Sequence, residues 1–180
     1  MNKSLNKENS IPLKRKFKIN WLPIVLAIIL YFIINQLIFF TIGVPSDSMY
    51  PTITPGDKIW TLRIHDMSKI KRGDIIVFWN KEIGDMLVKR VIGLPNDKVS
   101  VSEDGSLVVN GKKLNENYAT SKGEKSGEYI VPADSYFFLG DNLADSYDSR
   151  YWKNPYINKE DIKGKAWVRY YPFDRFGDLK

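Results

Sequence analysis

The chain offers few side chains for covalent catalysis, because its 180 residues include no cysteine and a single histidine. Without cysteine it has no thiol nucleophile, no disulfide framework and no Cys-based zinc or iron–sulfur site. One histidine is too few for a His-rich metal centre, so we predict neither a metal nor another cofactor. Covalent catalysis must therefore use serine, threonine or lysine, or a serine paired with His65.

A Ser–Lys pair is the better arrangement. Ser48 lies between two prolines, whose rings fix φ and restrict the residues before them, so this segment can hold a hydroxyl in one place. Lys89 lies in an apolar stretch, where strand alternation puts Leu87 and Val91 on its own face. Burial there would favour the neutral amine, which can accept a proton. A lysine that extends from an edge strand into solvent fits the same pattern equally well.

His65 is the alternative base. It follows the predicted strand Lys58–Ile64, and its neighbour Asp66 points elsewhere. A histidine at the end of a strand is usually a surface residue, so we expect His65 to matter little for catalysis.

Charge and hydropathy divide the chain into three parts. Residues 1–20 carry six basic residues and one acidic residue, and no charged residue occurs from Ile19 to Ser46. About 20 apolar residues in a helix span about 30 Å, the thickness of a bilayer core. We predict a cytoplasmic tail at 1–20, a transmembrane anchor helix at 21–42 and an extracytoplasmic catalytic domain at 43–180. A buried core helix or a cleaved signal peptide fits this long apolar run less well.

The net charge of +6 does not indicate a nucleic-acid partner. Residues 47–180 hold 21 basic and 20 acidic residues, so the excess of positive charge belongs to the tail. The residues after the anchor read as short strands rich in Val, Ile, Trp and Phe, separated by turn signals such as Asp104-Gly105 and Asn110-Gly111. The predicted strands are 58–64, 74–79, 86–92, 98–101, 107–109, 129–131, 136–139 and 165–171, with a loop at 121–128 and a short helical turn within 155–162.

Four segments resemble type I bacterial signal peptidases, the membrane-anchored Ser–Lys proteases that remove signal peptides from exported preproteins. They occur in the order of that family and, with the apolar anchor, cover nearly the whole chain. Two positions depart from the family pattern: Asn96 stands where glycine is usual, and Leu143 stands where arginine is common. The four segments are Ser46–Thr52, Arg72–Phe78, Lys89–Asp97, and Leu139–Asn142 continuing to Ser146–Arg150.

The resemblance implies that Ser48 is the acyl-enzyme nucleophile and Lys89 its general base. The other matching site positions support these two: Ser46 for the oxyanion hole, Ser146 for orienting the amine, and Asp148 and Arg150 as a structural pair. The resemblance also implies apolar substrate pockets that admit Ala or Gly at the residue before the scissile bond and at the residue two before that. The pocket positions are Val44, Pro45, Met49, Ile53, Leu87 and Val88.

The implied fold is the mostly β fold shared with self-cleaving repressor proteases, here with one N-terminal transmembrane helix. The implied partners are preprotein signal peptides, the lipid bilayer of the plasma membrane and the secretion translocase. Three alternatives stay open. A repressor-type protease would carry a DNA-binding domain where the apolar segment lies. A catalytically silent relative would bind export substrates without cutting them, and a membrane-tethered β-domain would have no protease role.

Overall fold

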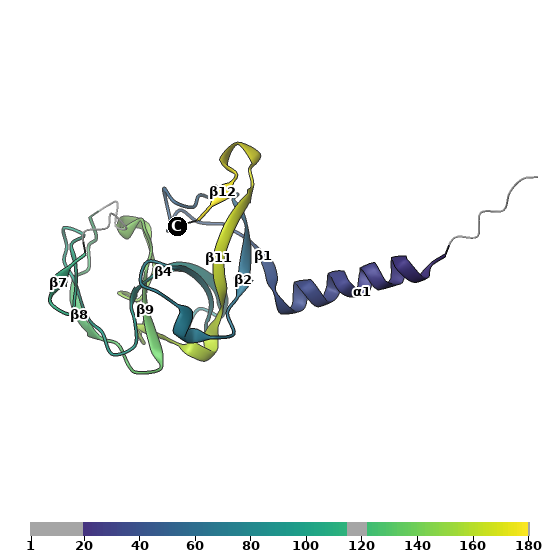
Figure 1. Cartoon of the computed structure of the whole chain (residues 1–180). Helices are drawn as coiled ribbons and strands as arrows, with labels where there is room; N and C mark the ends of the chain where they lie inside the picture. The colour runs from purple at the N-terminus through teal and green to yellow at the C-terminus, as the bar shows by residue number, and fades with distance from the viewer. Residues whose placement is uncertain (1–19, 115–121, 180) are drawn as a thin grey trace, which may run out of the picture.

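The computed structural model describes residues 20–114 and 122–179. Over these residues it has a single α-helix, α1 (Leu22–Leu37), which projects away from a body of β-strands (Figure 1). The prediction of a mostly β protein is confirmed. Pro23 occupies the first turn of α1, where its missing N–H costs no helical hydrogen bond. The N–H of Leu22 donates to Asn20 Oδ1 at 3.1 Å.

The apolar segment predicted as one anchor helix, residues 21–42, is divided between helix and strand. α1 ends at Leu37, and β1 (Phe39–Gly43) pairs antiparallel with β2 (Lys58–Arg63). The helix is shorter than predicted because aromatic and β-branched residues at 39–42 suit a pleated strand whose backbone has a partner. Within the described part of the chain, no helix is both long enough and apolar enough to cross a membrane.

Eight strands form the larger sheet in the order β1-β2-β11-β3-β4-β9-β10, with β12 paired to β11. All of these pairs are antiparallel. The strand β4 (Asp85–Gly93) lies between β3 (Ile75–Asn80) and β9 (Ser135–Leu139), so its backbone is paired on both sides. The remaining strands of this sheet are β10 (Tyr156–Asn158), β11 (Ile162–Tyr171) and β12 (Gly177–Asp178).

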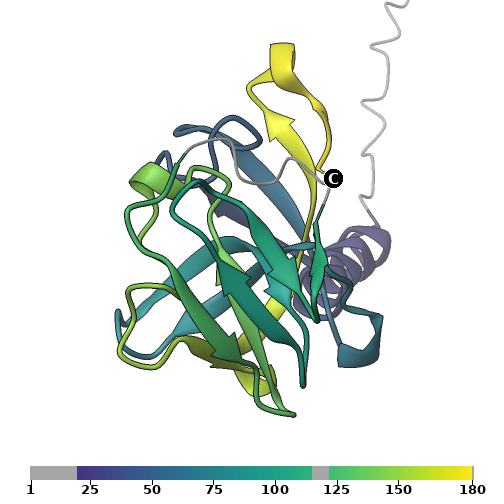
Figure 2. The same ribbon diagram turned by 90° about the vertical axis from the view of Figure 1, so that its left-hand side faces the viewer.

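A second sheet of four short strands lies on the side of the body away from α1 (Figure 1 and Figure 2). Both predicted turns occur in it, with φ of 85° at Gly105, 52° at Asn110 and 76° at Gly111. Asn96 also adopts a positive φ of 68°, which explains how asparagine replaces glycine at that position. The strands are β5 (Lys98–Val101), β6 (Leu107–Val109), β7 (Lys112–Lys113) and β8 (Gly127–Ile130) in the order β7-β6-β5-β8.

Four 3₁₀-helical turns complete the described structure: η1 (Met67–Lys69), η2 (Leu143–Asp145), η3 (Lys159–Asp161) and η4 (Phe173–Arg175). The helical turn predicted within residues 155–162 is present as η3, but β10 occupies the first half of that stretch. Residue 121 of the predicted loop lies outside the described residues, and the last two residues of that loop begin β8.

The hydrophobic core has three clusters, one of which supports the segment around Ser48. Met49 and Ile53 are fully buried in this cluster, where they pack among residues of the larger sheet such as Ile59 and Ile75. Burying a side chain of this size contributes about 1.5–3 kcal/mol. The burial of these two side chains therefore stabilises the position of an otherwise irregular loop against the sheet.

Candidate active site

Ser48 lies in the loop that joins β1 to β2, residues 44–57. Turns shape this loop: the N–H of Tyr50 donates to the carbonyl of Asp47, and the N–H of Ile53 donates to that of Met49, both at 2.9 Å. Ser48 is 8% exposed. Its hydroxyl lies 3.3 Å from that of Ser46. The loop therefore presents two serine hydroxyls side by side.

Lys89 lies in β4 and is 4% exposed, so its side chain does not extend into solvent as the alternative interpretation required. Its Nζ donates a hydrogen bond of 3.0 Å to Ser146 Oγ. Burial lowers the pKa of Lys89 from 10.5 to about 8, against the opposing effect of the Asp148 carboxylate. Arg150 adds a repulsion that lowers this pKa further. A lysine with a pKa of about 8 is about one tenth neutral at pH 7, whereas an ordinary lysine is almost wholly charged.

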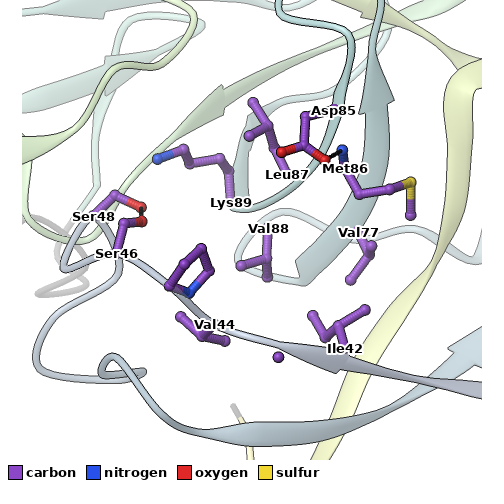
Figure 3. A pocket seen from close by; sticks show the side chains of 12 residues that line it. Ile42, Val44, Ser46, Ser48, Val77, Asp85, Met86, Leu87, Val88 and Lys89 are labelled. Atoms are coloured by element: carbon purple, nitrogen blue, oxygen red, sulfur yellow. Dashed lines mark hydrogen bonds between the residues drawn. The ribbon is translucent and has the colours of Figure 1, made fainter.

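The amine and the two serine hydroxyls lie together at one end of a groove (Figure 3). Within the described residues, no hydrogen bond joins Lys89 Nζ to Ser48 Oγ. Catalytic hydrogen bonds are often long in a free enzyme and shorten only when substrate binds. The arrangement therefore brings together a hydroxyl that can act as a nucleophile, an amine that can act as a base and a second hydroxyl that orients this amine.

The groove has a volume of about 330 Å³ and is bounded by the end of β1, the start of the Ser48 loop and β4. Four of the six predicted pocket residues line it: Val44, Pro45, Leu87 and Val88. The other two, Met49 and Ile53, are fully buried beneath the loop and are absent from its lining. Sequence reasoning missed five further lining residues: Ile42, Gly43, Val77, Asp85 and Met86.

Asp148 and Arg150 form an ion pair whose side chains are 0% exposed. Arg150 Nε lies 2.8 Å from Asp148 Oδ1, and Arg150 Nη2 lies 2.9 Å from Asp148 Oδ2. The same Nη2 donates to the carbonyl of Leu143 at 2.9 Å, and Asp148 Oδ2 accepts the N–H of Gly140 at 3.1 Å. The pair thus fixes both ends of the turn that presents Ser146. Leu143 itself is buried in the core beside the smaller sheet.

A second buried ion pair connects the two halves of the site, and sequence reasoning did not predict it. Arg90 donates to both oxygens of Asp141, at 2.7 Å through Nε and 2.6 Å through Nη2, and both side chains are almost fully buried. The hydroxyl of Thr52 donates to the same carboxylate at 2.5 Å. Arg90 follows Lys89 in β4 and Thr52 belongs to the Ser48 loop, so Asp141 connects the strand of Lys89 to the loop of Ser48.

Gly140 is the other residue whose role the sequence left unassigned. A Cβ at this position would lie 2.2 Å from Ser146 Oγ and 2.3 Å from the carbonyl oxygen of Ser48. That same carbonyl accepts the N–H of Asn142 at 3.1 Å. The backbone at 140–142 therefore lies so close to Ser48 and Ser146 that position 140 has room only for glycine. The sequence signal for this contact was Gly140-Asp141-Asn142, which belongs to the fourth segment that resembles the family.

His65 is absent from the groove lining, and its Nε2 lies 3.0 Å from the carbonyl oxygen of Leu37 at the end of α1. Among the residues that the structure describes, no group of three or more His, Asp or Glu side chains is arranged to hold a metal ion. The catalytic candidates that line the groove are Ser46, Ser48 and Lys89.

Comparison with known proteins identifies the family of this chain. Residues 18–171 match the family model described as signal peptidase, peptidase S26. The chain belongs to this family. A signal peptidase I of Leptolyngbya laminosa is 40% identical over 146 residues, which are 76% of this chain and 70% of that protein. A probable signal peptidase I-2 of Synechocystis is 41% identical over 144 residues, and the match covers 76% of this chain and 65% of that protein.

Signal peptidase I P of Bacillus subtilis subsp. natto is 33% identical over 180 residues, and the match covers 93% of this chain and 96% of that protein. The crystal structure of a signal peptidase I from Enterococcus faecalis V583 is similar with a TM-score of 0.48 and 30% identity, over 56% of this chain and 98% of that one.

Proposed function

We propose that this chain cleaves signal peptides from exported preproteins by a Ser–Lys mechanism, with Ser48 as nucleophile and Lys89 as general base. Membership of peptidase S26 makes the chain a serine peptidase that removes signal peptides. The assignment of roles to its residues rests on the geometry of the groove. The observation that carries it is the burial of Lys89 beside Ser146, with a pKa of about 8.

In the first half of the reaction, the neutral amine of Lys89 takes the proton of Ser48 Oγ as that oxygen bonds to the scissile carbonyl carbon. The negative charge that develops on the carbonyl oxygen is stabilised by the N–H of Ser48 and the hydroxyl of Ser46. The resulting ammonium of Lys89 then gives its proton to the leaving amine, and an acyl-enzyme remains. In the second half, Lys89 takes a proton from water as the water oxygen attacks the ester carbonyl carbon. The bond from that carbon to Ser48 Oγ then breaks, the ammonium of Lys89 returns the proton to Ser48 Oγ, and the signal peptide leaves with a free carboxylate.

The shape of the groove supports an extended substrate with small side chains near the scissile bond. A peptide added beside a strand binds through its main chain, and alternate side chains enter the groove, so recognition makes few demands on sequence. Val44, Leu87 and Val88 restrict the space beside the serines. These contacts favour Ala or Gly at the residue before the scissile bond and at the residue two before that.

We also propose that the chain is anchored in the plasma membrane by the apolar segment that contains α1, with residues 1–20 in the cytoplasm and the β body outside. The charge pattern supports this topology, because the tail is basic and the following segment has no charge. None of the α1 residues is buried, and most of its large apolar side chains are exposed in the described structure. The translocase would then deliver preproteins to the outer face.

Protease protection tests the topology. A protease added to spheroplasts should degrade residues 43–180 and leave an epitope at the N-terminus protected. An accessible epitope together with a protected domain would overturn the proposed orientation.

A cleavage assay tests the activity. The full chain in detergent should cut a purified preprotein at one bond, which mass spectrometry of both products would place after a small residue. Ser48→Ala should bind the preprotein and leave it intact. Cleavage by Ser48→Ala at the wild-type rate would refute the nucleophile, and binding without cleavage by the wild-type chain would favour the catalytically silent alternative.

A further inference from the structure

The Ser48 loop, residues 44–57, also contacts the C-terminal part of the chain, through Arg169 and Arg175. Asp57 ends this loop and is 1% exposed. Arg175, in η4, places Nη1 at 3.0 Å from Asp57 Oδ1 and 3.2 Å from Asp57 Oδ2. Arg169, in β11, places its Nη1 at 3.4 Å from Asp57 Oδ2. One buried carboxylate thus faces two guanidinium groups from a segment more than 100 positions away in the sequence.

Asp57 also closes the loop on itself. Its carbonyl accepts the N–H of Val44 at 3.0 Å, and its Oδ2 accepts the N–H of Thr54 at 3.0 Å. The N–H of Gly56 returns a bond to the carbonyl of Val44 at 2.9 Å. These bonds join the two ends of the loop. Contacts that fix the position of Asp57 therefore also fix the loop that carries Ser48.

The same two guanidinium groups also reach other groups of the loop close to Ser48. Arg169 Nη1 donates to the carbonyl of Thr52 at 3.0 Å, and Arg175 Nη2 donates to that of Pro51 at 3.4 Å. Arg175 Nη1 also donates to the hydroxyl of Thr54. These partners lie three to six residues after Ser48.

We propose that Arg169 and Arg175 are positioning residues for Ser48, which hold the loop so that its hydroxyl stays in register with the amine of Lys89. This inference rests on the proposed role of Ser48 as nucleophile. The two arginines act through Asp57 and the carbonyls of Pro51 and Thr52. A misplacement of about 1 Å in a reacting group can cost about 100-fold in rate, so loss of this support should appear in the chemical step.

The side-chain chemistry explains why arginine stands at position 175. A planar guanidinium carries several donors in a fixed fork, which lets it bind Asp57 and the Pro51 carbonyl together. The compact ammonium of lysine can keep the charge pairing with Asp57 but cannot span both partners. Arg175→Lys therefore separates the positioning of the loop from the simple neutralisation of a buried charge.

The test compares kcat, KM and the melting temperature of Arg175→Gln, Arg175→Lys and Arg169→Lys in the full chain, with a peptide substrate. Arg72→Gln is the matched control, because Arg72 forms a similar half-buried pair with Asp97 (3.0 Å) and donates to the carbonyl of Ile92, away from the Ser48 loop. All rates are corrected for the folded fraction, measured by circular dichroism.

We expect Arg175→Gln to lower kcat about 30- to 100-fold and Arg175→Lys and Arg169→Lys about 10-fold, with KM changed less than about twofold. The melting temperature of Arg175→Lys should stay close to that of the wild type, and the pH midpoint of kcat/KM should not move, because neither arginine contacts Lys89. Wild-type kcat in folded Arg175→Lys and Arg169→Lys, or the same loss of kcat in Arg72→Gln, would overturn the inference. An active Ser48→Ala would instead refute the proposed function itself.

Discussion

The two halves of the proposed dyad are positioned in different ways. Lys89 belongs to a strand that is paired on both sides, and its depressed pKa follows from burial in the sheet. Ser48 belongs to a loop whose position depends on the contact of Thr52 with Asp141, on the contacts of Asp57 with two distant arginines and on the backbone at Gly140. The sheet therefore fixes the position and the burial of the proposed base, whereas contacts between distant segments fix the position of the proposed nucleophile. Substitutions near Lys89 should therefore alter the protonation of its amine. Substitutions around the Ser48 loop should alter the position of the Ser48 hydroxyl relative to that amine.

The largest effect is expected at the base itself. Lys89→Met and Lys89→Arg should each lower kcat/KM by at least about 1,000-fold, because neither side chain accepts a proton near neutral pH. Kinetics with a preprotein or peptide substrate measures this loss. A Lys89→Arg protein that retained activity would refute the assignment of the base.

Lys89→Met should also stabilise the fold while it abolishes activity. The pKa of Lys89 is about 8 in the folded chain and 10.5 when unfolded, so at pH 7 folding bears the cost of burying or neutralising the amine, about 3 kcal/mol. This cost is full below pH 8 and disappears as the pH rises from about 8 to 10.5, because the unfolded chain binds the extra proton in that window. Urea unfolding at pH 7 and pH 10.5 measures it. The linkage would be contradicted if the free energy of unfolding of the wild type, measured relative to that of Lys89→Met, decreased from pH 7 to pH 10.5.

On the side of the nucleophile, Gly140→Ala should have the next largest effect. The added Cβ would collide with the Ser48 carbonyl and the Ser146 hydroxyl, so the backbone must shift by more than half an ångström. We expect kcat to fall about 100-fold and the melting temperature to fall as well. Gly177→Ala is a matched control, since a Cβ there meets nothing within 4 Å and Gly177 does not line the groove. Equal kinetics for the two variants would show that the close approach at Gly140 does not matter.

Ser146→Ala should have a smaller effect that tests the support of the base. It removes the acceptor of the Lys89 hydrogen bond, so the amine stays buried but loses its orientation. We expect kcat/KM to fall about 10- to 100-fold. The variant should fold normally, because the pair of Asp148 and Arg150 beneath it is intact. No change in rate would mean that packing alone orients the amine.

The sequence was most informative where the relevant signal was local. Strand alternation predicted that Lys89 shares an apolar face with Leu87 and Val91, and the structure packs these two residues in one core cluster. The apolar run before the domain was ambiguous, since Phe39–Gly43 could continue a helix as easily as form a strand. Only pairing with β2 decides between the two, and the partner lies about 20 residues away.

The contacts that hold the Ser48 loop could not be predicted in the same way. Asp57, Arg169 and Arg175 carry no local pattern that brings them together, because the folding of β11 against β2 creates their contact. The same reason applies to Asp141, which meets Thr52 across 89 positions of sequence. Motif resemblance indicated the residues that we propose to react, whereas the groups proposed to position the nucleophile became visible only in three dimensions.

The most direct test of the central claim, that a buried neutral Lys89 is the base, is the pH dependence of kcat/KM for the full chain. This quantity reports the ionisation of the free enzyme. Because the folded pKa is about 8, kcat/KM should rise about tenfold per pH unit up to about pH 7, reach half its maximum near pH 8 and become constant above about pH 9. A substrate without groups that titrate in this range is required. A profile that is flat from pH 6 to 9, or one that rises with a midpoint near 10.5, would contradict the account.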